Sequence, residues 1–339
     1  MLASYYQKLE KNKVQCKLCP HNCIISENKS GICKVRSNIK GDLISENYGI
    51  ISSMGFDPIE KKPLYHFYPG NEILSIGSFG CNLKCAFCQN WQISQCGVND
   101  TNRAKSFYKP EDIVHLAGNR PSNIGIAYTY NEPTIFFEFM MDVAKEANKK
   151  GFKNVMVSNG YINQEPLNEL NQYIDAYSID LKAFNNNFFK KYTQSELEPV
   201  QNTLINIVKA QKHLEITNLV IPTLNDNEHE FEQMVKWIKN KLGENIVLHI
   251  SRYYPTYKLN IEPTSIEKLT DLYNIARKYL KYVYLGNVML SEGNNTICPN
   301  CGTLIVSRKG YSITKQNLDE KGCCIHCGNL IFEHLNMNE

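Results

Sequence analysis

The chain has 339 residues, which is more than one ordinary core holds but suits a single barrel with small attached modules. Its 37 basic and 34 acidic side chains leave a net charge of only +3, which argues against a general nucleic-acid or membrane-surface binder. We find neither a cleavable leader at its start nor an apolar run near the ~20 residues of a membrane helix, so we expect a cytoplasmic protein.

The 13 cysteines are the informative part of the composition, because they fall into three groups. The groups are Cys16 to Cys33, Cys81 to Cys96 and Cys298 to Cys327. Clustered thiols in a reducing compartment are more often metal ligands than disulfide partners. Each group is therefore a candidate metal site.

The first group lies in a polar N-terminal segment, which we assign to residues 1–72. It offers four thiols, with His21 as an alternative ligand, and they are Cys16, Cys19, Cys23 and Cys33. Four thiolates suit either a zinc ion or a second iron–sulfur cluster. We therefore predict an N-terminal metal module whose metal the spacing does not identify.

Between residues 73 and 290, short β-rich runs alternate with segments of helical period, as parallel strands joined by crossover helices do. The strand candidates are Ile73–Phe79, Asn123–Tyr128, Asn154–Ser158, Ala176–Asp180, Ile216–Ile221 and Ile246–Ile250, with Val283–Gly286 as a further one. Helical segments include Pro133–Lys150, Val200–His213, Glu228–Leu242 and Ser265–Tyr282. This pattern predicts an α/β fold, an incomplete (β/α)6 TIM-like barrel, whose chemistry would sit at the C-terminal ends of the strands.

The second cysteine group follows the first predicted strand directly, in a glycine-led loop. Cys81, Cys85 and Cys88 have the spacing Cys-x3-Cys-x2-Cys. Three thiolates can each bind one iron of a [4Fe–4S] cube and leave the fourth iron open to a small-molecule chelator. A zinc site usually has four ligands, so the triplet favours the cluster.

This loop, with Phe87 directly before Cys88, resembles the cluster motif of the radical S-adenosylmethionine (radical SAM) superfamily. The resemblance implies that the amino and carboxylate groups of S-adenosylmethionine (SAM) chelate the open iron. One electron from the reduced cluster would then yield methionine and a 5′-deoxyadenosyl radical, which abstracts hydrogen from a substrate. It implies no catalytic side chain beyond the cluster ligands.

Polar residues after the next three strands resemble the SAM contacts of the activating-enzyme branch of this superfamily. Asn131 and Glu132 match a segment that faces the SAM amino group, although an ordinary helix start is the alternative, and Tyr130 and Asn131 stand where that branch has glycines. The other matching residues are Ser158, Asn159, Asp180 and Lys182. The resemblance implies that Asp180 accepts from the ribose hydroxyls and that Lys182 neutralises the methionine carboxylate.

Two later strand-end residues are weaker candidates. Val220 resembles an adenine contact of the same branch, but it suits the plain core equally well. His249 is a candidate for the SAM ribose or an anionic substrate, with a satisfied structural histidine as the alternative.

The third cysteine group, in residues 294–334, has the spacing Cys-x2-Cys-x22-Cys-x2-Cys with a glycine after each pair, as in a zinc ribbon or rubredoxin. Its ligands would be Cys298, Cys301, Cys324 and Cys327. Such a site fits zinc or a single iron. Cys323 is surplus here and could replace Cys324, and Cys96 has no assigned role.

Over nearly its whole length the chain closely resembles the radical SAM member of the AmmeMemoRadiSam system, which is related to pyruvate formate-lyase activating enzymes. The segments that carry this likeness include Cys16–Cys23, Gly31–Arg36, Asp57–Leu64, His66–Gly70 and Cys88–Trp91. The resemblance implies association with AMMECR- and Memo-family proteins and an electron donor such as flavodoxin or ferredoxin. Two alternatives remain open: a glycyl-radical enzyme activase, and a metal-stapled, non-catalytic RNA- or protein-binding module.

Overall fold

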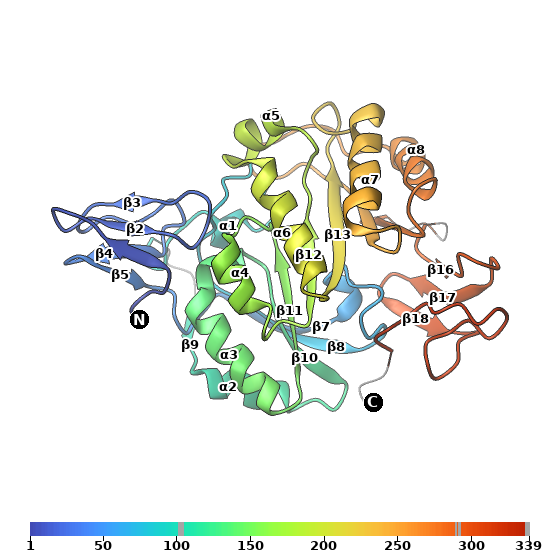
Figure 1. Cartoon of the computed structure of the whole chain (residues 1–339), viewed down its shortest axis with the longest axis horizontal. Helices are drawn as coiled ribbons and strands as arrows, with labels where there is room; N and C mark the ends of the chain where they lie inside the picture. Colours follow the sequence, from blue (N-terminus) through green and yellow to red (C-terminus); the bar gives the residue numbers. More distant parts are fainter. Residues whose placement is uncertain (101–104, 289, 291–292, 336–339) are drawn as a thin grey trace.

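The computed structural model describes residues 1–100, 105–288, 290 and 293–335. Its centre is an eight-stranded sheet in the order β15-β14-β13-β12-β11-β10-β8-β7 (Figure 1). The strands are β7 (Ser53–Pro58), β8 (Glu72–Gly77), β10 (Asn123–Tyr128), β11 (Lys153–Ser158), β12 (Ala176–Asp180), β13 (His213–Val220), β14 (Val247–Arg252) and β15 (Tyr282–Gly286). All run parallel except β7, which pairs antiparallel with β8. The α/β fold and its open, barrel-like parallel sheet are confirmed.

Helices follow the parallel strands and cover one face of the sheet (Figure 1). The longer ones are α2 (Pro110–Ala117), α3 (Phe137–Lys149), α4 (Gln164–Leu170), α6 (Leu197–Lys209), α7 (Glu228–Leu242) and α8 (Ile266–Arg277). Short turns are α1 (Trp91–Ser94), α5 (Asn186–Phe188), η1 (Ile59–Lys61), η2 (Pro133–Phe136) and η3 (Phe189–Thr193). The helical segment predicted to reach His213 ends at Lys209, because His213 already pairs with Ala176 as the first residue of β13.

Side chains alternate between the two faces of the strands, as the pleat requires. Leu74 and Ile126 pack into the large core shared with the helices. Ile73 and Ala127 pack on the other face around Phe67, which comes from the segment before β8. The concave face is therefore closed by residues that lie outside the β/α units.

The N-terminal segment forms small antiparallel sheets at one end of the molecule (Figure 1). Its strands are β1 (Tyr6–Lys8), β2 (Val14–Cys16), β3 (Ile24–Ile25), β4 (Arg36–Ile39), β5 (Asp42–Ser45) and β6 (Ile50–Ile51), and β6 pairs with β9 (Ser106–Phe107). A buried ion pair of 2.9 Å between Arg36 and Glu138 ties it to α3. Residues 53–58, which the sequence analysis grouped with this segment, belong to the central sheet as β7.

The C-terminal residues form a three-stranded sheet at the opposite end (Figure 1). Its strands are β16 (Thr296–Ile297), β17 (Leu304–Lys309) and β18 (Ser312–Lys315). Ile305 and Phe332 pack against Tyr282 and Tyr284 of β15, so this module shares a small core with the end of the barrel. None of the described helices combines the length and the apolar character that a membrane crossing requires.

Candidate metal and cofactor site

The loop after β8 carries Cys81, Cys85 and Cys88 at the C-terminal edge of the parallel sheet. It is held by main-chain hydrogen bonds of 2.9 Å from the Lys84 and Ala86 amides to carbonyls of η3. Burial raises the pKa of the Cys85 thiol to about 12 and also raises the pKa values of Cys81 and Cys88. Thiols in such surroundings ionise when a metal supplies positive charge. One buried and two half-buried thiols on one loop therefore suit an iron–sulfur cluster.

Asn131 and Asn159 bind this loop from the ends of neighbouring strands. The Asn131 side chain accepts from the Ser78 amide and donates to the Gly80 carbonyl, both at 2.9 Å. Asn159 Nδ2 donates to Asn82 Oδ1 at 2.9 Å and lies 3.9 Å from Cys81 Sγ. Both predicted residues thus lie beside the cysteine loop and position it.

Tyr130 stands at a position where the activating-enzyme branch has a glycine. Its backbone has the left-handed conformation that glycine favours, with a φ of 70°. This left-handed conformation is costly for a bulky side chain. Two contacts hold it: Tyr130 Oη donates to Asp57 Oδ2 at 2.9 Å, and its carbonyl accepts from Asn90 Nδ2 at 2.6 Å. Asp57 belongs to β7, so the edge strand helps to shape the loop after β10, a role that the sequence analysis missed.

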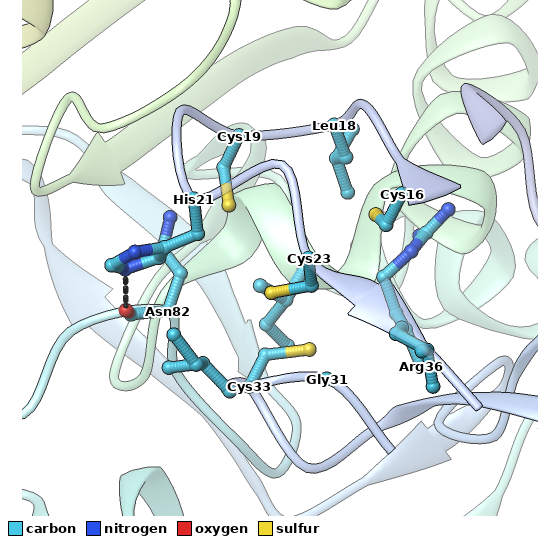
Figure 2. Close-up of a pocket in the computed structure, with 12 residues that line it drawn as sticks. Cys16, Leu18, Cys19, His21, Cys23, Gly31, Cys33, Arg36 and Asn82 are labelled. Atoms are coloured by element: carbon cyan, nitrogen blue, oxygen red, sulfur yellow. Dashed lines mark hydrogen bonds between the residues drawn. The ribbon is translucent and has the colours of Figure 1, made fainter. Parts of the chain in front are cut away.

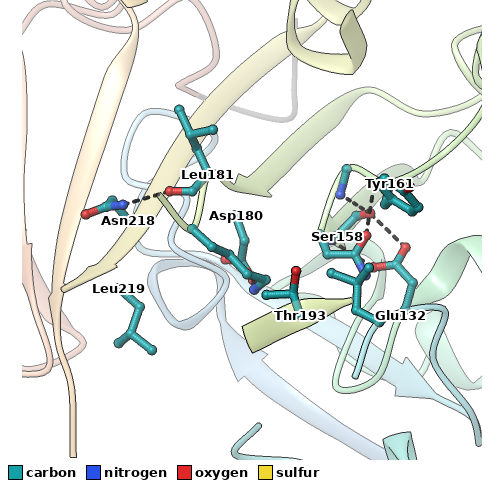
Figure 3. Close-up of polar contacts among 12 residues, drawn as sticks. Glu132, Ser158, Tyr161, Asp180, Leu181, Thr193, Asn218 and Leu219 are labelled. Atoms are coloured by element: carbon teal, nitrogen blue, oxygen red, sulfur yellow. Dashed lines mark hydrogen bonds and ion pairs between the residues drawn. The ribbon is translucent and has the colours of Figure 1, made fainter. Parts of the chain in front are cut away.

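Glu132 joins the ends of β10 and β11 (Figure 3). Its carboxylate accepts from Ser158 Oγ at 2.7 Å, from the Asn159 amide at 2.8 Å and from the Thr134 amide at 3.0 Å. Burial raises the pKa of Glu132, while these donors oppose the rise. A carboxylate has about four lone-pair sites, so about one stays open for a ligand cation.

Asp180 and Lys182 form an ion pair of 2.7 Å at the end of β12, and Lys182 Nζ also lies 5.9 Å from the ring centre of Phe87. Burial alone would lower the pKa of Lys182, but Asp180 and the cysteine thiols outweigh it and raise that pKa, so the lysine is charged. The Asp180 side chain is 38% exposed against 13% for Lys182. The carboxylate is thus the more accessible partner.

Two hydroxyl groups near Asp180 were not predicted. Ser178 lies two residues before Asp180 on β12, and Thr217 pairs in register with Asp180 from β13. Their hydroxyl oxygens are buried without a hydrogen-bond partner among the described residues. The sequence does contain a signal for Ser178. Side chains two positions apart on a strand point to the same face of the sheet, so Ser178 is expected on the same face as Asp180.

Val220 and His249 do not join this group of contacts. Val220 is fully buried, and its carbonyl accepts from Thr264 Oγ1 at 2.6 Å. His249 Nε2 lies 2.6 Å from Glu215 Oε2, and its ring packs edge-on against Tyr65. The structure thus places Val220 in the core and His249 in a buried polar network, which are the alternatives weighed for each.

The four C-terminal cysteines converge on one point. All four sulfur atoms lie within 4.8 Å of one another, with Cys298 and Cys327 at 3.5 Å and Cys301 and Cys324 at 3.6 Å. Four sulfurs at 2.3 Å from a tetrahedral zinc ion would be about 3.8 Å apart, so the set suits one ion. Cys323 is not part of this set.

The N-terminal cysteines line a cavity together with Arg36 and Asn82 (Figure 2). They are Cys16, Cys19, Cys23 and Cys33. Nε2 of the alternative ligand His21 lies 2.8 Å from the Asn82 carbonyl oxygen, which leaves Nδ1 as the ring nitrogen that could bind a metal. None of these four cysteines forms a disulfide, so their thiols are available to bind metal.

Comparisons with known proteins agree with this geometry. Residues 75–238 match the radical SAM superfamily. An uncharacterized protein of Methanocaldococcus jannaschii is 44% identical over 332 residues, which is 97% of this chain and 98% of the relative. The 4-hydroxyphenylacetate decarboxylase activating enzyme of Clostridium scatologenes is 26% identical over 228 residues, 62% of this chain and 71% of the relative. The crystal structure of a radical SAM methyltransferase from Sphaerobacter thermophilus has a TM-score of 0.52 at 14% identity and covers 70% of this chain and 71% of that chain.

Proposed function

Because this chain belongs to the radical SAM superfamily and is an enzyme of SAM-cleaving radical chemistry, we propose that it works at a [4Fe–4S] cluster held by Cys81, Cys85 and Cys88. When bound, the cluster supplies the electron that cleaves SAM to methionine and a 5′-deoxyadenosyl radical, which abstracts hydrogen from a small-molecule or protein substrate. The observation that carries the proposal is the cysteine triplet at the C-terminal edge of the sheet, next to the polar ends of β10, β11 and β12.

The strand-end residues bind and orient SAM in this proposal. Glu132, fixed by three donors, offers its remaining lone pair to the SAM ammonium group. The half-buried Asp180 carboxylate accepts from the ribose hydroxyls, and Lys182 attracts the SAM carboxylate. Ser158, Asn131 and Asn159 are positioning residues, because their side chains contact Glu132 or the cysteine loop.

The surrounding requirements follow from the same proposal. One-electron chemistry requires an electron donor, and we propose a low-potential flavodoxin or ferredoxin. The C-terminal site holds zinc or a single iron as a structural ion, since its sulfurs are already close enough for one tetrahedral ion. Association with AMMECR- and Memo-family proteins and a cytoplasmic location complete the proposal, and cysteines without disulfides suit a reducing compartment.

Electron paramagnetic resonance (EPR) of the reduced protein tests this proposal. The chain is loaded anaerobically with iron and sulfide and reduced with dithionite, and spectra are recorded with and without SAM. We expect SAM to change the cluster signal of the unmutated chain, and Cys88→Ala to abolish that change. The Cys323→Ala variant is the control, because Cys323 lies outside all three proposed ligand sets. An EPR spectrum of the unmutated chain that is the same with and without SAM would contradict the proposal.

A second candidate is activation of a glycyl-radical enzyme. The observation that favours it is the similarity to the 4-hydroxyphenylacetate decarboxylase activating enzyme, which spans 62% of this chain. The substrate would then be a glycine C–H bond of a partner protein. A glycine-centred EPR doublet on the partner after turnover would identify this function, while a modified small molecule would identify the first.

A further inference from the structure

We propose that Cys16, Cys19, Cys23 and Cys33 hold a second [4Fe–4S] cluster, and not a single zinc ion. This inference goes beyond the proposed function, because it concerns a site that SAM does not touch. The four cysteines line one cavity (Figure 2).

The distances between the sulfur atoms distinguish a site for a single ion from a site for a [4Fe–4S] cluster. Among the residues that the structure describes, the C-terminal set is the group whose sulfurs all come within 4.8 Å of one another, as ligands of one ion do. The sulfur atoms of the four N-terminal cysteines do not all lie within this distance of one another, although these cysteines line a single cavity. In a cube each cysteine binds a different iron, so its ligand sulfurs stand further apart than those around one ion. The same chain thus contains both arrangements.

Arg36 supplies an independent sign of a missing ligand. Its side chain lines the cavity and is only 1% exposed. The terminal nitrogens Nη1 and Nη2 are paired with Glu138 and the Ser4 carbonyl. Nε, by contrast, is buried and has no hydrogen-bond partner among the described residues. A buried unpaired donor costs about 1–3 kcal/mol, and cluster or thiolate sulfur in the cavity would accept its hydrogen.

Main-chain groups are already arranged around the sulfurs. The backbones of His21, Ile32 and Val35 lie within hydrogen-bonding reach of the thiols of Cys19, Cys23 and Cys33, respectively. Hydrogen bonds to the sulfurs are one of the means by which proteins tune iron–sulfur clusters. The cavity therefore provides four thiols and several donors for one charged cluster.

This second site lies directly beside the first. A Cβ on Gly80 would come within 2.5 Å of the Cys33 carbonyl oxygen, so the two backbones touch there. Gly80 adjoins Cys81, whose Cα is about 3.8 Å further along the chain. The positive φ of 87° at Gly80 makes glycine doubly necessary at this contact.

The decisive measurement counts acid-labile sulfide, because single zinc or iron ions carry none. In the anaerobically loaded, unmutated chain we expect about eight sulfides per chain, four for each cluster. In the triple variant Cys81→Ala, Cys85→Ala, Cys88→Ala we expect about four sulfides and a reducible cluster signal in EPR. About four sulfides in the unmutated chain, with zinc bound at two sites, would overturn the proposal.

Two further variants separate this inference from the proposed function. Replacing Cys16 and Cys33 by Ala should remove about four sulfides while the SAM-responsive signal of the other cluster persists. Cys323→Ala is the matched control and should keep all eight. If the sulfide count is eight but no signal responds to SAM, the proposed function fails and the second cluster stands. If Cys16→Ala, Cys33→Ala keeps eight sulfides, the second cluster is refuted.

Discussion

His21 of the N-terminal module lies 2.8 Å through Nε2 from the main-chain oxygen of Asn82, the residue that follows the first cysteine of the barrel loop. The same Asn82 donates from Nδ2 to the Tyr161 carbonyl at 2.7 Å and accepts from Asn159. A residue of the N-terminal module and one end of the parallel sheet therefore meet at the neighbour of Cys81. Any groups bound at the two cysteine sites are held at a fixed, short separation.

A magnetic interaction between the two clusters should follow from this proximity. When both clusters are reduced, each carries an unpaired spin, so we expect the EPR spectrum of the unmutated chain to be broadened or split. The reference is the sum of two spectra, from the Cys81→Ala, Cys85→Ala, Cys88→Ala and the Cys16→Ala, Cys33→Ala variants. A wild-type spectrum that equals this sum would show that the two clusters do not interact.

Replacing Glu132 by Gln should weaken SAM binding. The substitution places an amide group where Ser158, Asn159 and Thr134 all present donors, and it removes the negative charge proposed to meet the SAM ammonium. Hydrogen bonds to charged groups contribute about 1.5–3 kcal/mol, so we expect the dissociation constant to rise about 10- to 100-fold. Equilibrium dialysis of SAM against the cluster-loaded protein measures it.

The control for this variant is Glu146→Gln. Glu146 pairs with Lys149 on the surface of α3, at 2.6 Å, and lies outside the proposed SAM site. Its SAM affinity should equal that of the unmutated chain. An unchanged affinity in Glu132→Gln would remove Glu132 from the SAM site.

The C-terminal metal site gives a prediction about stability. Cys324 is buried and belongs to the set of four converging sulfurs, whereas Cys323 does not. We expect Cys324→Ala to lose about one metal ion per chain and to lower the thermal midpoint, because the site ties together a module with a small core. Cys323→Ala should keep both. Metal analysis with thermal unfolding decides, and metal loss in Cys323→Ala alone would reverse the ligand assignment.

His66 makes stability depend on acid pH. Its Nε2 lies 2.6 Å from Tyr284 Oη and its Nδ1 lies 3.1 Å from the Ile331 carbonyl, so it links the barrel to the C-terminal module as a neutral ring. Burial lowers its pKa to about 3. In the unfolded chain the pKa of this histidine is about 6.5. Between pH 6.5 and pH 3 the His66 ring is therefore protonated in the unfolded chain and neutral in the folded chain.

The free energy of unfolding should therefore fall as pH falls through this window, by up to about 1.4 kcal/mol per pH unit from His66 alone. His66→Gln removes this titration and should show a correspondingly smaller loss. Urea unfolding of both proteins at pH 6.5 and pH 5 measures the difference. Equal losses in the two proteins would mean that His66 is not kept neutral in the folded state.

The arrangement of the parallel strands could be predicted from the sequence, because each strand is a compact apolar run followed by a helical pattern. Since parallel strands end at one edge, the prediction also brought Glu132, Ser158 and Asp180 near the cysteine loop. The edge strand β7 was missed, because a run that contains Gly55 and ends at Pro58 is a weak strand signal.

Long-range polar partners were beyond prediction. Glu215 lies 34 positions before His249 and 150 positions after Tyr65. Its carboxylate nevertheless contacts the ring of His249 and accepts from the main-chain amide of Tyr65. Nothing local in the sequence identifies such a pair, so the role of His249 could only be left open. Arg36 and Glu138, 102 positions apart, are a second example.

Formation of 5′-deoxyadenosine is the most direct test of the central claim. The unmutated chain, loaded with iron and sulfide under anaerobic conditions and given dithionite and SAM, should produce 5′-deoxyadenosine and methionine in equal amounts. The Cys81→Ala, Cys85→Ala, Cys88→Ala variant should produce neither above the background of SAM and dithionite alone. A fully iron-loaded chain that forms no 5′-deoxyadenosine, or a triple variant that still forms it, would contradict a SAM-cleaving cluster at this loop.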